Sequence, residues 1–143
     1  MKYIRIFFSL FLTIMLVPNI VMAAENAIKL TAPATASKDE EISVDITLES
    51  NVAINEFKAT LTYETKALEI LSIENKNGWK QETPFSDESP MTFDFIHENG
   101  VSGKTTVATI KFKVKSDVAK SSTTVSVEGT TKVKDDETIN SLE

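Results

Sequence analysis

Residues 108–114, with the sequence Ala-Thr-Ile-Lys-Phe-Lys-Val, alternate without a break between apolar and polar side chains. The same alternation fills residues 42–48 and 57–63, and Val125 and Val127 continue it further along the chain. A period of two residues is typical of a β-strand with one face on a core and one face in water. Threonine, valine, isoleucine and phenylalanine, which dominate these runs, also suit a pleated, half-buried surface. The sequence therefore predicts an all-β protein.

Polar turn segments lie between the alternating runs. They are residues 37–40, 75–78, 84–90, 98–103 and 116–122. Seven or eight short strands with such breaks predict a β-sandwich rather than an α/β fold. Residues 64–71 contain helix formers, but the stretch is short and lies between strands, so we expect a turn followed by a strand. The inward phase of the strands predicts a set of buried residues: Leu61, Tyr63, Leu68, Ile110 and Phe112.

The first 23 residues have the three parts of a secretory signal peptide in the right order. Lys2 and Arg5 form a short positive region, residues 6–17 are almost wholly apolar, and residues 21–23 are acceptable before a cleavage site. A retained membrane anchor is the alternative, and the polar residues and Pro18 within the apolar stretch weaken it.

We expect cleavage after Ala23 or Ala24 and a single mature domain over residues 24–143. The product would be secreted and, once cleaved, would have no membrane segment. The frequent use of Lys, Asn, Glu and Ile suggests a Gram-positive bacterium as the source.

The charge of the chain excludes several classes of partner. The net charge is −6, and loss of Lys2 and Arg5 would leave 13 basic against 21 acidic residues, a net charge of −8. Nucleic acid needs a basic footprint, and so does an anionic lipid surface. We therefore expect neither as a partner. The sequence contains no cysteine, so export would bring no disulfide.

Three segments carry a resemblance to a known family. Residues 54–70 are similar to a strand that ends in Tyr-Asp, turns, and resumes with Leu-Glu-Val. Residues 91–95 resemble an apolar strand before a Gly-containing loop, and residues 106–115 resemble the pattern Gly-x-[Leu/Val]-Ala-x-Ile-x-Phe-x-Val-Lys. All three patterns belong to the cohesin domain of cellulosomal scaffolding proteins. The resemblance implies an antiparallel, jelly-roll-like β-sandwich of the carbohydrate-binding-module type.

The chain departs from the family pattern in three places. Glu64 follows the tyrosine where the family usually has Asp, and Thr105 and Thr106 stand where it usually has Gly. The family also closes with one more strand, which residues 140–143 do not resemble. We therefore expect about eight strands, with the final strand missing through truncation or replaced by an exposed edge.

The resemblance implies that one flat sheet face receives a helical dockerin partner. Matching strands places that face on the outward positions of three runs, in which Ile96 and Val107 are apolar residues that suit a mild contact patch. The predicted partner-binding residues are Glu56, Lys58, Thr60, Asp94, Ile96, Thr109 and Lys111.

Trp79 is the candidate for a different function. An exposed tryptophan on a β-sandwich can stack on a sugar ring, whereas a buried one covers the edge of the core. Related folds bind polysaccharide through a row of aromatic residues, and this chain has a single Trp. A protein partner is therefore favoured over a polysaccharide.

Residues for catalysis or metal binding are sparse. His97 is the only histidine, and no Gly-x-Ser-x-Gly elbow is present. A calcium loop ending near the C-terminus would place Lys132 and Lys134 at ligand positions, which defeats the site. We expect no enzyme activity, metal or cofactor. The predicted function is that of a secreted binding module in an extracellular polysaccharide-degrading or cell-surface assembly, with a carbohydrate-binding module as the alternative.

Overall fold

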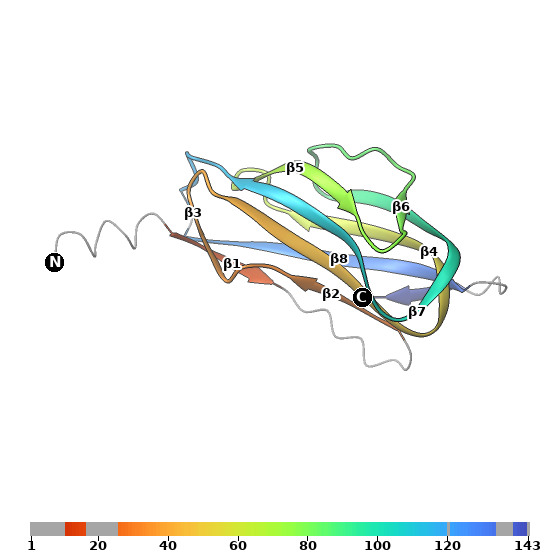
Figure 1. Ribbon diagram of the computed structural model, residues 1–143. Coiled ribbons are helices and arrows are strands. Elements are labelled where there is room, and N and C mark those ends of the chain that lie inside the picture. The colour runs from red at the N-terminus through yellow and green to blue at the C-terminus, as the bar shows by residue number, and fades with distance from the viewer. Residues whose placement is uncertain (1–10, 17–25, 120, 134–138, 143) are drawn as a thin grey trace.

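The computed structural model describes residues 11–16, 26–119, 121–133 and 139–142, which form nine strands (Figure 1). In chain order they are β1 (Phe11–Leu16), β2 (Asn26–Thr31), β3 (Thr35–Ser37), β4 (Glu41–Tyr63), β5 (Leu68–Asn75), β6 (Lys80–Gln81), β7 (Met91–Val114), β8 (Ser122–Val133) and β9 (Ile139–Leu142). Within these residues there is no helix of the length and hydrophobicity that a membrane crossing requires.

The two longest strands, β4 and β7, build both layers of the molecule. The first half of β4, up to Ser50, pairs antiparallel with the second half of β7, from Gly103 onward. After a register irregularity, β4 from Ile54 onward pairs with β7 from Val101 back to Met91. Both strands turn back on themselves at the right-hand end of the molecule in Figure 1. Each strand therefore contributes one half to each sheet.

The remaining strands extend these two paired halves into a β-sandwich. In the first layer, β2 flanks the first half of β4, and β5 flanks the second half of β7. In the second layer, β8 flanks the second half of β4, and the short β6 flanks the first half of β7. The predicted antiparallel sandwich is confirmed.

The outer edge of β8 carries two further strands. β9 pairs antiparallel with residues 129–132, and β1 pairs in parallel with residues 122–125 and antiparallel with β3. The structure thus has a strand at Ile139–Leu142, where the sequence analysis expected none. A strand of only four residues is too short to show a clear alternation of apolar and polar side chains in the sequence. β1 lies inside the segment predicted to be cleaved, and that cleavage stays a prediction.

The core lies between the layers and consists of the inward residues of both. All five residues predicted to be buried are buried, with 0–4% of their surface exposed. Tyr63 and Phe112 meet edge to face at 5.2 Å, and Phe57 stacks on Phe95 at 6.0 Å. Aromatic pairs in such geometries add to the free energy gained from burial.

Two of the predicted turns are found as expected, whereas residues 98–103, also predicted as a turn, lie within β7. Glu64 O accepts hydrogen bonds from the backbone amides of Ala67 and Leu68, which closes a turn before β5. Asn77 and Gly78 have φ angles of 51° and 82°, the left-handed conformation that favours these two residue types. This second turn directs Trp79 into the core.

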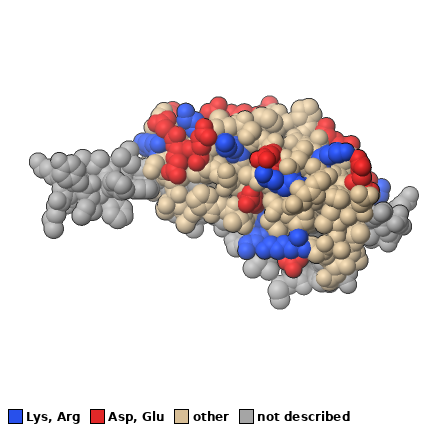
Figure 2. Space-filling view, in the orientation of Figure 1, with Lys and Arg blue, Asp and Glu red and all other residues tan. Residues whose placement is uncertain are grey.

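Charged side chains of both signs are interspersed on the face seen in Figure 2. Basic residues form no continuous stripe on that face.

Candidate functional site

The outward surface of the second layer is a broad sheet face of polar residues, which we call the mixed-charge face. It is formed by the outward positions of β8, the second half of β4, the first half of β7, and β6 with the residue after it. Its members are Glu56, Lys58, Thr60, Thr62, Lys80, Glu82, Thr92, Asp94, Ile96, Glu128, Thr130 and Lys132.

Strand register arranges these residues in rows across the face. One row runs Lys132, Glu56, Ile96 and Lys80. The next row runs Thr130, Lys58 and Asp94, and the third runs Glu128, Thr60 and Thr92. Directly opposed residues on neighbouring strands lie close enough to interact. Acidic, basic and hydroxyl side chains therefore alternate across the sheet.

The ion pairs on this face are exposed to solvent. Lys58 Nζ lies 3.5 Å from Asp94 Oδ1, with 60% and 43% of the two side chains exposed. Lys132 Nζ lies 3.4 Å from Glu56 Oε1. Such pairs contribute little to folding stability. A partner can therefore rearrange them at small cost and use their charges for its own contacts.

At the β6 end of the face, Lys80 Nζ donates a hydrogen bond to Glu98 Oε1 at 2.6 Å. This hydrogen bond, more than the attraction between the charges, raises the pKa of Lys80 and lowers that of Glu98. Both residues therefore keep their charges over the pH range in which most proteins operate.

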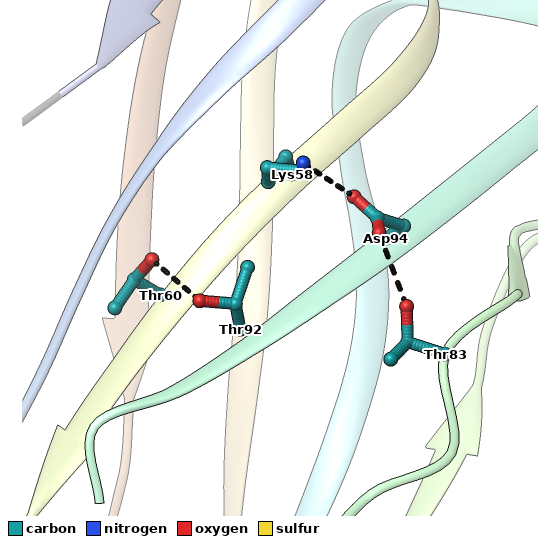
Figure 3. A network of polar contacts seen from close by, with 5 residues as sticks. All are labelled: Lys58, Thr60, Thr83, Thr92 and Asp94. Atoms are coloured by element: carbon teal, nitrogen blue, oxygen red, sulfur yellow. Dashed lines mark hydrogen bonds and ion pairs between the residues drawn. The ribbon is translucent and has the colours of Figure 1, made fainter.

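Asp94 connects the centre of the face to the segment that follows β6 (Figure 3). Its Oδ1 pairs with Lys58, and its Oδ2 accepts a hydrogen bond from Thr83 Oγ1 at 3.1 Å. The backbone amide of Glu82 also donates to Asp94 O at 2.8 Å. Beside this network the hydroxyls of Thr60 and Thr92 lie 3.2 Å apart. Asp94 is thus held on two sides.

The surface is hollowed around these residues. A hollow of about 510 Å³ is lined by Glu56, Lys58, Glu82, Asp94, Ile96 and Lys132, together with Phe57, Phe95 and the β8 residues Thr130 and Thr131. Ile96 is half-buried there and gives the polar face an apolar patch. A face of this composition, apolar at one point and charged around it, suits a protein contact.

The structure brings together five of the seven predicted partner-binding residues: Glu56, Lys58, Thr60, Asp94 and Ile96. It places Thr109 and Lys111 on the other sheet, where they pair with Asp45 and Ser43 of the first half of β4. The prediction that these two residues share one face with the other five is therefore wrong. Both are outward residues of β7, but β7 changes layers between Ile96 and Thr109.

Val107 was expected on the outward phase and is instead fully buried. Ile46 pairs with Ala108 and Thr47 pairs with Thr106, so Val107 is an extra residue between two ladder positions. Such a β-bulge interrupts the alternation. Val107 and Ala108 therefore both face the core.

The contribution of β8 and of Glu82 to this face was not predicted from the sequence. Ser126, Glu128 and Thr130 alternate with the buried Val125, Val127 and Thr131, so the pattern for a half-buried strand was present. The sequence gives no sign that β8 lies beside β4 and completes the mixed-charge face.

Trp79 is only 2% exposed, so its ring cannot stack on a sugar. The ring packs edge to face against His97 at 5.4 Å. Nε2 of His97 makes a hydrogen bond of 3.1 Å with Asn77 O. Both residues therefore support the turn between β5 and β6.

A second hollow, of about 870 Å³, lies at the end of the sandwich beside Tyr63, Lys66, Asp87 and Lys115. Tyr63 Oη donates to Asp87 Oδ1 at 2.9 Å, and the amide of Ile70 donates to the same oxygen at 3.3 Å. Burial, and then the hydrogen bond to Asp87, raises the pKa of Tyr63 well above its usual value. A phenol held protonated in this way fastens the 84–90 loop to the core.

Within the described part of the chain, no three His, Asp or Glu side chains gather in a group that could hold a metal ion.

Comparison with known proteins gives one family match. The cohesin domain family matches this chain over residues 27–141. A search of curated proteins found no match.

Several solved structures share the fold. The cohesin module of a family 33 glycoside hydrolase from Clostridium perfringens superposes with a TM-score of 0.69 at 8% identity, covering 83% of this chain and 90% of that one. The cohesin from the sixth position of scaffoldin B of Acetivibrio cellulolyticus, solved with a dockerin, has a TM-score of 0.65 at 17% identity, covering 83% and 96%. A type I cohesin–dockerin complex from Clostridium thermocellum has a TM-score of 0.64 at 15% identity, covering 83% and 98%.

Proposed function

Since this chain belongs to the cohesin domain family, we propose that it is a non-catalytic module that binds a dockerin-type protein through the mixed-charge face. Two of the structurally similar cohesins were solved in complex with dockerins. We further propose that the module acts outside the cell, in a polysaccharide-degrading or surface assembly. The N-terminal signal pattern supports this location.

The observation that carries the proposal is the arrangement of the mixed-charge face. Four neighbouring strands present exposed charges and hydroxyls in rows, and the half-buried Ile96 lies among them. A broad sheet face with a shallow hollow, one apolar residue and a charged rim fits the side of a helix better than it fits a small molecule. The alternative function, polysaccharide binding, is not supported, because the buried Trp79 cannot stack on a sugar ring.

The test compares three charge-reversal variants. Lys58→Glu and Asp94→Lys change the centre of the mixed-charge face, whereas Lys111→Glu makes the same kind of change on the other sheet. All three side chains are at least partly exposed, so each variant should fold. Binding would be measured by surface plasmon resonance at several salt concentrations, against the dockerins of the Acetivibrio cellulolyticus and Clostridium thermocellum complexes and a wider dockerin panel.

We expect Lys58→Glu and Asp94→Lys to slow association and weaken binding, most strongly at low salt. Lys111→Glu should bind as the wild type does. Equal losses in all three variants would show that the contact is not on this face. Failure to bind any dockerin, together with binding to cellulose or another glycan, would contradict the proposed function itself.

A further inference from the structure

The strand position between β3 and β8 is occupied by a segment that we expect to leave the protein. β1 fills this position and lies wholly within residues 1–23. It pairs with Thr35–Ser37 on one side and with residues 122–125 on the other. Cleavage after Ala23 or Ala24 would disconnect β1 from the chain and leave two backbone edges facing each other.

On the β8 side of this position, residues 122–125 are held in place by contacts that do not involve β1. Val125 pairs with Tyr63 in β4, and Thr123 Oγ1 donates to Glu64 Oε2 at 2.9 Å. This side is therefore fixed to the body of the sandwich.

On the β3 side, it is the turn after the strand that is fixed without β1. The turn after β3 is tied to the end of β7 by two backbone hydrogen bonds of 2.9 Å, from Asp39 N to Val114 O and from Val114 N to Glu40 O. The amide of Ser37 also donates to Glu40 Oε2 at 2.6 Å. β3 itself pairs with β1 alone among the described strands, so without β1 it is anchored through this turn and through the buried Ala36, whereas the β8 side keeps its pairing with β4.

The chemistry of the position favours an apolar occupant. With β1 in place, Ala36 on β3, and Thr123 and Val125 on β8, are almost fully buried. Exposed backbone edges of a sheet accept a further strand, and the side chains beside them set which sequences fit. The segment now in place has the sequence Phe-Leu-Thr-Ile-Met-Leu.

We infer that, after loss of residues 1–23, this position is a second binding site that accepts an extended apolar segment of another polypeptide, running parallel to β8. The inference rests on the predicted cleavage and not on the docking proposal, because the mixed-charge face lies on a different surface of the second layer.

The first experiment keeps the full chain. A protease site is inserted between Leu16 and Asn26, the protein is folded, and the chain is then cut. We expect the N-terminal fragment to remain bound after the cut. It should exchange with an added labelled peptide of residues 11–16 that carries terminal lysines for solubility. Hydrogen exchange should show the amides of residues 122–125 protected while either strand is bound and exposed when both are removed.

The matched control is the same peptide with Ile14→Pro, which cannot donate its backbone hydrogen bond. We expect it to exchange about tenfold less well or worse, because proline is not tolerated inside a sheet. In the uncut chain, the pair Thr13→Cys and Ser122→Cys, which are register partners, should form a disulfide on mild oxidation. This pair tests the position of β1 without any cut.

Three results would overturn the inference. One is release of the fragment on cutting with no change in exchange at residues 122–125. Another is peptide protection on the mixed-charge face, and the third is failure of the cysteine pair to cross-link. Dockerin binding measured on the same cut protein reports separately on the docking proposal, so the two can fail independently.

Discussion

At the scale of single residues, Phe112 offers a direct measure of the packing between the two layers. Its ring is fully buried and meets Tyr63 edge to face. Phe112→Ala should lower the free energy of unfolding by about 3–5 kcal/mol, because it removes buried area and leaves a cavity. A urea titration measures this loss. The exposed neighbour Lys111→Ala should change stability by no more than about 0.5 kcal/mol, and a similarly small effect of Phe112→Ala would contradict the assigned core.

Tyr63 predicts a dependence of stability on alkaline pH. Burial and the hydrogen bond to Asp87 raise its pKa in the folded state above its ordinary value. A raised pKa means that the folded state favours the protonated phenol. The resulting stabilisation is complete below the unfolded-state pKa of about 10 and is lost as the pH rises from there towards the folded-state pKa.

Tyr63→Phe removes both the titrating group and its hydrogen bond, and it keeps the ring. We expect the wild type to be the more stable protein at pH 8 by about 1 kcal/mol. Its free energy of unfolding should fall more steeply than that of Tyr63→Phe above about pH 10. Urea titrations at a series of pH values measure both curves, and parallel curves would show that Tyr63 does not titrate on unfolding.

Sequence alternation predicted residue burial well and failed at a bulge. Leu61 and Ile110 follow a strict period of two, and both are buried as expected. Val107 breaks that period, because it is an extra residue of β7 that has no partner in β4, between the pairs that β4 forms with Thr106 and Ala108. The bulge depends on pairing between distant segments. The local pattern of apolar and polar residues could not show it.

At the scale of elements, Gly129 controls how closely β8 approaches β4. A Cβ atom at this position would lie 2.5 Å from the backbone oxygen of Lys58 and 2.7 Å from the Phe57 ring. Gly129→Ala should therefore push the two strands apart and cost about 1–3 kcal/mol. It should also weaken partner binding, because β8 carries one side of the mixed-charge face. Thermal unfolding and dockerin binding measure the two effects, with the half-exposed Thr130→Ala as the stability control.

A loss in Thr130→Ala as large as that in Gly129→Ala would indicate that β8 is sensitive to any change. Full stability of Gly129→Ala would show that the close approach of the strands is not tight in solution.

The assignment of strands to layers was the part of the fold that the sequence did not reveal. Alternation shows which side chains of a strand face the core, but it does not show which sheet the strand joins. Lys58 and Lys111 both occupy outward positions, and they lie on opposite layers because β4 and β7 each cross from one layer to the other. The three segments that resemble the cohesin family predicted the sandwich itself, and the family match confirms that resemblance.

At the scale of the whole molecule, the N-terminal pattern predicts the form in which the protein acts. Expressed in a Gram-positive host, the protein should appear in the culture fluid with Ala24 or Glu25 as its first residue. N-terminal sequencing of the secreted product measures this. Intact Met1 recovered from the membrane fraction would identify an anchor instead and would leave the β3–β8 position permanently filled.

Because β4 and β7 each belong to both layers, the topology also limits the speed at which the protein can fold. Neither sheet is complete until β4 pairs with β7. Glu41, for example, pairs with Lys113, and both β5 and β6 lie between these two residues in the sequence. Closing so long a stretch of chain costs entropy before any contact repays it, and β-sandwiches of this kind fold on a scale of about milliseconds to seconds. A chain that stays unfolded for that long can still be threaded through a narrow export channel. For the export proposed above, the same crossing strands that hold the finished sandwich together would thus keep the newly made chain unfolded during its passage.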